Sequence, residues 1–268
     1  MPRTRRTALI TGASAGIGRE FAKVFAEHGF DLVLVARRAD KLQQLAEELR
    51  PTHRVTVTVI SQDLTLEDAP QAVFDKVQGA GIKIDVLVNN AGISFFEAFA
   101  DTPLDQHLKL LQLNVVVLTA LTRIFVDPMI ERGWGRIINL ASVTAFQPTP
   151  SLALYGASKA FVLSLSEALA EELRGTGVTV TAVCPGFTDT PMVRNALAAR
   201  GGQRPVASFL LLDPEGVARE GYRAAMRGKV IQVNGLPYRL TAQLVRFPPR
   251  WLTRTIAGLV GRLALSEY

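Results

Sequence analysis

Short runs of apolar and β-branched residues alternate along the chain with longer stretches in which apolar positions recur every three or four residues. The short runs are typical of strands covered on both faces, and the longer stretches are typical of amphipathic helices. The pattern predicts seven strands, at residues 7–11, 31–36, 54–60, 84–88, 136–141, 178–184 and 229–233. Such alternation predicts an α/β fold: a doubly wound, parallel, seven-stranded sheet with helices on both faces and right-handed crossovers.

Proline and capping residues mark the ends of several predicted helices. Helices are expected at residues 17–28, 40–50 and 65–79, the second of them ended by Pro51. Thr102 and Asp213 each stand directly before a proline. Each is therefore expected to cap a helix that the proline opens.

Two segments do not fit the alternation. Residues 187–212 form a connection longer than usual between a strand and a helix, and such insertions are often active-site lids. Residues 236–268 follow the last predicted strand. Because no repeat, low-complexity linker or shift in composition interrupts the chain, we expect residues 1–268 to form a single domain with these two additions.

Composition supports a compact soluble domain, since 48% of the 268 residues are hydrophobic and 20% are charged. One cysteine, Cys184, excludes an internal disulfide and is expected to be a buried strand residue. His28, His53 and His107 lack the spacing of metal ligands, so no metal is expected. No apolar run approaches the roughly 18 residues of a spanning helix, and none near the start resembles a signal peptide. We therefore expect a cytoplasmic location.

The net charge of +6 is concentrated at the two ends of the chain. A nucleic-acid-binding protein would carry its positive charge on a face of the fold, so no nucleic-acid partner is expected. In the extension, Pro249 can open a helix whose apolar positions Leu252, Ile256, Leu259 and Leu263 lie near one face, apart from Arg250, Arg254 and Arg262. Basic amphipathic helices of this kind can lie on anionic membranes. The alternative is that the apolar face packs on the body or on another subunit of a homo-oligomer.

A glycine-rich loop joins the first predicted strand to the first helix, with the sequence Thr11-Gly12-Ala13-Ser14-Ala15-Gly16-Ile17-Gly18. Glycines in this context allow a sharp turn, a close approach of pyrophosphate to the backbone, and close packing of helix against strand. The phosphates then lie at a helix N-terminus, where free N–H groups favour negative charge. The loop predicts a dinucleotide site that includes Gly12, Ser14, Gly16, Ile17 and Gly18; the alternative is a glycine turn without a ligand.

The end of the second predicted strand indicates which dinucleotide is preferred. A site for NAD normally has an acidic residue here that binds the ribose 2′-hydroxyl. This chain has Ala36 followed by Arg37 and Arg38. Because guanidinium groups pair with a 2′-phosphate, NADP(H) is favoured over NAD(H). The alternative is that both arginines are solvated residues at the start of a helix.

Three further motifs resemble the short-chain dehydrogenase/reductase family. Asn89-Asn90-Ala91-Gly92 follows the fourth strand, Tyr155-Gly156-Ala157-Ser158-Lys159 lies in a helical pattern with Ser142 thirteen residues before the tyrosine, and Pro185-Gly186 follows the sixth strand. The glycine spacing GxxxGxG resembles that of the family's single-domain oxidoreductase branch. The resemblance covers about residues 7–233 and implies a Rossmann-like dinucleotide-binding catalytic domain.

The resemblance implies that Asn114, Ser142, Tyr155 and Lys159 are catalytic. Tyr155 and Lys159 are four residues apart in a helical pattern, so their side chains share one face. An ammonium about 4 Å from a phenolate contributes about 4 kcal/mol, enough to move the pKa of a tyrosine from about 10 toward ~7. Ser142 would bind the substrate oxygen, and the resemblance implies that Asn114 holds a water molecule that contacts the lysine.

Further cofactor contacts are implied by the resemblance. Asp63 and Leu64 match the pair that contacts adenine, although a turn before the next helix is an equal alternative. Thr188 often meets the nicotinamide carboxamide in this family, with Thr190 as an adjacent candidate. The remaining expected contacts are Asn90, Ala91, Gly92, Tyr155, Lys159, Pro185 and Gly186.

Apolar residues near the predicted site suggest a hydrophobic substrate. Residues 95–99 (sequence FFEAF), Phe146 and residues 209–212 (sequence FLLL) are candidates for the wall of a substrate pocket. Arg194, Arg200 and Arg204 suggest an anionic group on the substrate. We therefore expect an NADP-dependent carbonyl reductase or alcohol dehydrogenase that acts on a hydrophobic ketone, such as a 3-oxoacyl thioester or a steroid-like molecule. The alternatives are a catalytically idle NADP-binding sensor or scaffold, and a related lyase or isomerase.

Overall fold

The computed structural model describes residues 5–198, 210–245 and 247–265. One parallel sheet has the strand order β3-β2-β1-β4-β5-β6-β7, which confirms the predicted fold class. Its strands are β1 (Thr7–Thr11), β2 (Asp31–Ala36), β3 (Val57–Ser61), β4 (Val86–Asn89), β5 (Gly135–Leu140), β6 (Val178–Cys184) and β7 (Ile231–Val233). The chain order reverses between β1 and β4, and ligands of open α/β sheets bind at the carboxyl ends of the strands beside such a point.

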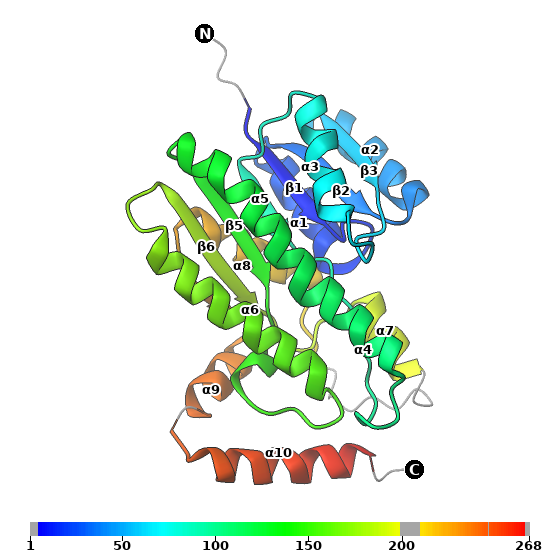
Figure 1. The fold of residues 1–268 in the computed structure, drawn as a ribbon, viewed down its shortest axis with the longest axis vertical. Helices are drawn as coiled ribbons and strands as arrows, with labels where there is room; N and C mark the ends of the chain where they lie inside the picture. Colours follow the sequence, from blue (N-terminus) through cyan, green and yellow to red (C-terminus); the bar gives the residue numbers. More distant parts are fainter. Residues whose placement is uncertain (1–4, 199–209, 246, 266–268) are drawn as a thin grey trace.

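Helices cover both faces of the sheet (Figure 1). One face is packed by α1 (Gly16–Glu27), α2 (Ala39–His53) and α8 (Pro214–Met226), which bury side chains such as Phe21, Leu45 and Val217. The other face is packed by α3 (Ala69–Gly79), α5 (Leu118–Glu131) and α6 (Ala153–Glu172), with side chains such as Val73 and Phe125 in a second core. Burial on both faces explains why the strands are almost continuously apolar.

A long helical run crosses the second face. It consists of α4 (Leu104–Leu111), a π-helical turn η1 (Gln112–Val117) and α5. The whole run, Leu104–Glu131, is long and apolar enough to cross a membrane by length and composition, although the sequence holds no uninterrupted apolar run of that length. Half of its most apolar 18-residue window is buried in the fold, as in the core helix of a globular domain. The π-helical turn widens the helix at Asn114, and such turns are frequent at functional sites.

The structure corrects the predicted end of one helix and the predicted start of the strand that follows it. Helix α2 does not end before Pro51 but continues to His53, so β3 starts at Val57 rather than at residue 54. Pro51 lies in the last turn, where the loss of one backbone hydrogen bond costs little, and the Thr52 hydroxyl donates to the Glu48 carbonyl there at 2.7 Å. Arg54 then ends the helix in the left-handed conformation, with φ 55°.

The two predicted caps have different outcomes. Asp213 is confirmed, because its side chain accepts a hydrogen bond from the Gly216 N–H at 3.0 Å. The prediction for Thr102 is wrong: its hydroxyl instead donates to the Ala98 carbonyl at 3.2 Å, and Pro103 is the uncapped residue before α4. The Thr102 hydroxyl therefore forms a hydrogen bond with the preceding loop instead of with the first turn of α4.

Both ends of the long insertion are joined to each other. Thr188 and Leu212 form a parallel β-bridge, and the Leu212 N–H donates to the Phe187 carbonyl at 2.8 Å. Helix α7 (Pro191–Ala198) and a 3₁₀ turn, η2 (Val143–Phe146), complete this edge of the domain. The chain ends with α9 (Leu236–Leu244) and α10 (Arg250–Leu265), which lie at the end of the molecule opposite the N-terminus (Figure 1).

Candidate active site

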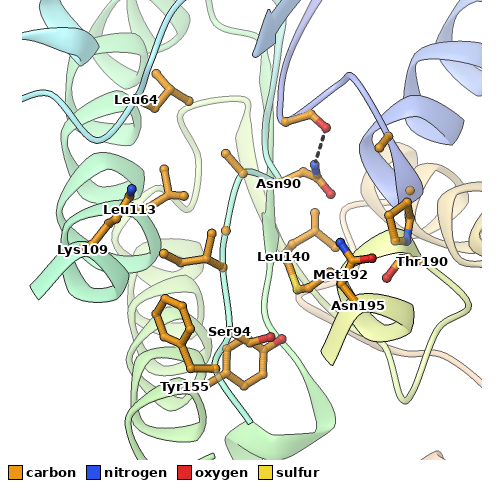
Figure 2. A pocket seen from close by; sticks show the side chains of 18 of the residues that line it. Leu64, Asn90, Ser94, Lys109, Leu113, Leu140, Tyr155, Thr190, Met192 and Asn195 are labelled. Carbon is orange, nitrogen blue, oxygen red and sulfur yellow. Dashed lines mark hydrogen bonds between the residues drawn. The ribbon is translucent and has the colours of Figure 1, made fainter. Parts of the chain in front are cut away.

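A large cleft of about 1190 Å³ opens at the carboxyl ends of the central strands. Its walls come from the glycine-rich loop, the loops after β2, β3 and β4, helix α4, the start of α6 and the segment that leads into α7. Figure 2 places Leu64 and Tyr155 toward opposite ends of the cleft, with Asn90 between them and Thr190 on the wall facing Lys109. These predicted site residues line it: Gly12, Ser14, Gly16, Ile17, Arg37, Arg38, Asp63, Leu64, Asn90, Ala91, Gly92, Tyr155, Lys159, Pro185 and Thr190.

The glycine-rich loop has the geometry of a phosphate-binding turn. Gly12 and Gly16 have φ of 66° and 56°, in the left-handed region that side chains disfavour. Helix α1 begins at Gly16, so its first N–H groups face the cleft where an anion would lie. Gly18 does not line the cleft, because it packs beneath the turn.

Asn90 ties the glycine-rich loop to β4. Its Nδ2 donates to the Thr11 carbonyl at 2.8 Å, and its N–H donates to the Thr11 hydroxyl at 2.9 Å. That hydroxyl in turn donates to the Val88 carbonyl at 3.1 Å. These bonds hold the two chain segments on either side of the topological reversal at a fixed separation.

The arginines after β2 lie at the distal end of the cleft. Both are exposed, and Arg38 Nη2 donates to the Ser14 hydroxyl at 3.1 Å, so it reaches across to the glycine-rich loop. The strand itself ends at Ala36, where an acidic residue would stand in a site for NAD. The pairing of Arg38 with Ser14 presents a cation and a hydroxyl together, which suits a phosphate oxygen.

Asp63 closes a turn and also lines the cleft. Its Oδ1 accepts hydrogen bonds from the N–H and the hydroxyl of Thr65 at 3.0 and 2.8 Å, which closes a turn. Burial acts to raise the pKa of this carboxyl group, but these hydrogen bonds and the charges of Arg37 and Lys109 outweigh it, so the pKa is lowered. Asp63 is therefore an anchored carboxylate that also lines the cleft beside Leu64.

Ser142, Tyr155 and Lys159 converge at the other end of the cleft. Ser142 follows β5, and Tyr155 and Lys159 lie one turn apart near the start of α6. Lys159 Nζ is 5.5 Å from the centre of the Tyr155 ring and donates to the Leu140 carbonyl at 2.7 Å. The lysine side chain is 5% exposed, so its direction is set by this single strong hydrogen bond. The predicted sharing of one helix face is confirmed.

The predicted lowering of the tyrosine pKa is wrong for the chain by itself. Burial disfavours the phenolate and raises the pKa of Tyr155 to about 12, although a hydrogen bond with Ser142 opposes the rise. Burial also lowers the pKa of Lys159 to about 8. The attraction between the ammonium and the phenolate, on which the prediction rested, is outweighed by the cost of removing the phenolate charge from water. Tyr155 is therefore protonated at neutral pH and is equipped to donate a proton.

The buried lysine predicts a pH dependence of stability. Because its pKa is about 8 in the folded chain and 10.5 ordinarily, the unfolded chain binds more protons between these values. Stability contributed by this group therefore rises with pH across that window. We expect the unfolding free energy of the wild type, relative to Lys159→Met, to increase by about 2 kcal/mol from pH 7 to pH 10. Urea unfolding of both proteins without added nucleotide measures this difference, and a difference that stays constant with pH contradicts the assignment.

Asn114 is 1% exposed and its amide is occupied by protein partners. Its Oδ1 accepts from the Ile93 N–H at 2.9 Å, and its Nδ2 donates to the Ile93 carbonyl at 3.0 Å and to the Ser158 hydroxyl at 3.3 Å. The side chain thus fixes the strand-like segment after β4 to the π-helical turn and to α6. Asn114 does not line the cleft, and its two hydrogen bonds with Ile93 hold that residue in place beside Gly92.

Comparison with known proteins identifies the family. The family model described as short chain dehydrogenase matches residues 6–201. The chain belongs to the short-chain dehydrogenase family. It is 34% identical over 268 residues to a bovine (Bos taurus) very-long-chain 3-oxoacyl-CoA reductase, a match that covers 97% of this chain and 81% of the relative. The matches to the human and macaque (Macaca fascicularis) proteins of the same name cover 61% of those chains.

Solved structures of the family share the fold and differ in cofactor. A short-chain dehydrogenase from Sphingobium yanoikuyae in complex with NADPH is 33% identical, with a TM-score of 0.80 and coverage of 89% of this chain and 92% of that one. A family member from Burkholderia phymatum in complex with NAD is 28% identical, with a TM-score of 0.81 and coverage of 90% and 92%. Both cofactors therefore occur in this family on closely similar folds.

Besides Gly18 and Asn114, three more of the predicted cofactor or catalytic residues do not line the cleft: Gly186, Thr188 and Ser142. Gly186 packs against the Tyr238 ring, and the Thr188 hydroxyl donates to the Gly186 carbonyl at 3.0 Å. Thr188 is thus turned inward, and of the two threonines it is Thr190 that lines the cleft. Ser142 is buried, and its hydroxyl accepts a hydrogen bond from the Thr144 N–H at 3.2 Å as well as contacting Tyr155.

The predicted substrate wall is only partly formed by the described residues. Phe95 and Phe96 line the cleft, whereas Phe99 is exposed and stacks on His107 with ring centres 4.5 Å apart. Arg194 forms an ion pair with Asp189 at 3.3 Å, which weakens the inference that it binds an anionic substrate. Arg200, Arg204 and Phe209 lie outside the described residues.

Sequence reasoning missed most of the wall between β4 and α5. Ser94, Asp101, Asp105, Gln106, Lys109 and Leu113 line the cleft, together with Met192 and Asn195 of α7, whereas Glu97 and Ala98 belong to the predicted wall segment 95–99. The spacing of Asp105, Lys109 and Leu113 at intervals of four, on a predicted helix after the fourth strand, is the signal that could have found this face.

Cys184 is buried, and burial raises the pKa of its thiol to about 12, so the thiol stays protonated.

Proposed function

We propose that this chain is an NADP(H)-dependent oxidoreductase that interconverts a hydrophobic ketone and the corresponding alcohol. The observation that carries the proposal is the shared cleft: the glycine-rich turn and the arginine pair lie at one end, and the Tyr155–Lys159 pair lies at the other. A cleft with these two ends suits a molecule that has an anionic nucleotide at one end and a reactive ring at the other.

The residues present fit a nicotinamide dinucleotide. A side chain at Gly12 would clash with the Asn90 amide and the backbone of Ala91, so only glycine lets this turn pack against the segment after β4 with the start of α1 facing the cleft. Arg37 and Arg38 would hold the 2′-phosphate of NADP, and Asp63 with Leu64 would contact the adenine end. When bound, the nicotinamide supplies or accepts the hydride.

The chain's own residues supply the proton and hold the carbonyl. In reduction, the Tyr155 hydroxyl donates its proton to the substrate oxygen, and the Ser142 hydroxyl binds the same oxygen as negative charge develops there. The Lys159 ammonium, held by Leu140, stabilises the phenolate that remains. Asn114 acts indirectly because it fixes the backbone of Ile93 beside Gly92.

A hydrophobic substrate is supported by Phe95 and Phe96 on the cleft wall and by the similarity to very-long-chain 3-oxoacyl-CoA reductases. A 3-oxoacyl thioester and a steroid-like ketone both match this wall.

We also propose a homo-oligomer, since Val116 and Phe161 are apolar and exposed on the outer helices. An idle nucleotide-binding sensor would have no use for a lysine charge buried beside a tyrosine. A lyase or isomerase would form product without net oxidation of NADPH.

A paired cofactor assay tests the proposal. We expect absorbance of NADPH to fall faster than that of NADH when the chain is mixed with a panel of long-chain and bulky ketones. We expect Arg37→Ser/Arg38→Ser to raise the KM for NADPH at least about tenfold while that for NADH changes little, because charge-assisted contacts to the 2′-phosphate are lost.

Lys41→Ser is the matched control, because Lys41 is an exposed cation further along α2 that does not line the cleft. Equal KM changes for both cofactors in the double variant contradict the assignment of NADP. Binding of NADPH without turnover of any ketone in the panel favours the sensor.

A further inference from the structure

Helix α9 is fixed to the body by one of its faces. The Tyr238 hydroxyl donates to the Leu210 carbonyl at 2.9 Å and accepts from the Phe187 N–H at 3.3 Å. Arg239 forms an ion pair with Glu220 at 3.2 Å, and Ala242 is buried. The helix is therefore held against the loop that follows Pro185, a residue of the cleft wall.

The opposite face of α9 is apolar and exposed. Leu236, Leu240 and Leu244 are spaced by four residues, so they form one stripe, and Leu240 and Leu244 are 56% and 65% exposed. Phe247 and Trp251 continue the apolar surface toward α10, with exposures of 83% and 62%. We name these five residues the C-terminal surface. A group of large apolar side chains exposed along one segment in this way marks an interaction site.

Arginines dominate the charge of the segment that carries the C-terminal surface. Residues 236–265 contain five arginines and no acidic residue. Arg250 and Arg254 are exposed on α10 and have no ion-pair partner in the part of the chain that the structure describes. Figure 1 shows that α10 lies along the end of the molecule, outside the layers that enclose the sheet.

We propose that the C-terminal surface docks on an anionic lipid surface. Arginines beside exposed leucine and aromatic side chains are the features with which peripheral helices bind anionic membranes, and tryptophan is enriched at the membrane interface. A second copy of this chain fits less well. In a twofold interface the patch would meet itself, and residues 236–265 offer no acidic side chain to pair with the partner's arginines.

The position of the C-terminal surface connects it to the cleft. Because Tyr238 contacts the loop after Pro185, a membrane bound by α9 lies near the edge of the cleft where the strands end. This orientation would let a lipid-soluble substrate enter without crossing water, a consequence that depends on the proposed function. The docking itself does not depend on it.

Vesicle sedimentation of the full chain tests the proposal. We expect the wild type to pellet with phosphatidylcholine vesicles that contain phosphatidylglycerol, and to pellet less with phosphatidylcholine alone or at high salt. We expect Leu240→Asn/Leu244→Asn to lower the partition coefficient at least about tenfold, because two exposed leucines no longer enter the bilayer. Arg250→Glu/Arg254→Glu should lower the partition coefficient at least about tenfold on the vesicles that contain phosphatidylglycerol and leave it unchanged on phosphatidylcholine alone.

Leu66→Asn is the control, since Leu66 is 53% exposed on a remote loop, and it should pellet like the wild type. Equal pelleting of the wild type with and without vesicles overturns the proposal. So does a leucine variant that pellets like the wild type. If light scattering shows that the leucine variant loses a dimer that the non-pelleting wild type forms, the surface is a self-association face. Reduction of a water-soluble ketone by all variants is measured separately, so failure of the reductase activity and failure of docking are told apart.

Discussion

Tyr155→Phe is expected to lower kcat/KM for ketone reduction by about a thousandfold. The phenyl ring keeps the shape of the side chain but has no proton to give to the substrate oxygen, and a positioned proton donor contributes roughly 10²–10⁴-fold. Lys159 stays held by the Leu140 carbonyl, so the affinity for NADPH should change by less than about threefold. Steady-state kinetics with the best ketone of the panel and fluorescence titration with NADPH measure the two quantities.

Tyr222→Phe is the matched control, because it also removes a tyrosine hydroxyl but at a site outside the cleft. Tyr222 packs edge-on against Phe25, with ring centres 5.1 Å apart, and does not line the cleft. This variant should keep full activity. A Tyr155→Phe protein that retains a tenth or more of the wild-type rate would remove the tyrosine from the mechanism, whereas loss of activity in both variants would point to instability.

The order of strands and helices could be read from the sequence because it depends on burial. Strands such as β1 and β2 lie between two helical layers, so their apolar runs are long and uniform. Boundaries depend on local hydrogen bonds that the pattern does not contain. Beyond Pro51 the Thr52 hydroxyl donates to the Glu48 carbonyl at the end of α2, and before α4 the Thr102 hydroxyl donates to the preceding loop.

The parts of the candidate site that could be predicted from sequence are those in which a local motif fixes the backbone conformation. Gly12 and Gly16 have the positive φ that their loop requires, and Tyr155 with Lys159 follows from one helical turn. The effect of burial on the pKa values of the site could not be predicted from a local motif. Burial raises the pKa of Tyr155 and lowers that of Lys159, opposite to the effect that charge alone predicts. The inward turn of Thr188 and the binding of Asn114 to Ile93 arise from contacts between distant segments, which no local pattern records.

Gly18 shows how packing away from a ligand can control the shape of its site. A Cβ at this position would lie 2.5 Å from the Gly12 carbonyl oxygen and closer still to Nδ2 of Asn90. The Asn90 amide cannot move freely, because it holds the Thr11 carbonyl at 2.8 Å. The Gly12 carbonyl belongs to the backbone of the turn itself. A methyl group at residue 18 must therefore displace the turn or separate β1 from the segment after β4.

Gly18→Ala is accordingly expected to lower the unfolding free energy by about 3 kcal/mol and the affinity for NADPH at least about tenfold, since overpacking and the displaced turn act together. Urea unfolding and fluorescence titration measure both. Gly79→Ala is the matched control, because a Cβ there meets nothing within 4 Å and its φ is not positive. It should leave both quantities near their wild-type values. If Gly18→Ala binds NADPH as tightly as the wild type, the turn can yield to a side chain beneath it, and its shape is then not what positions the pyrophosphate.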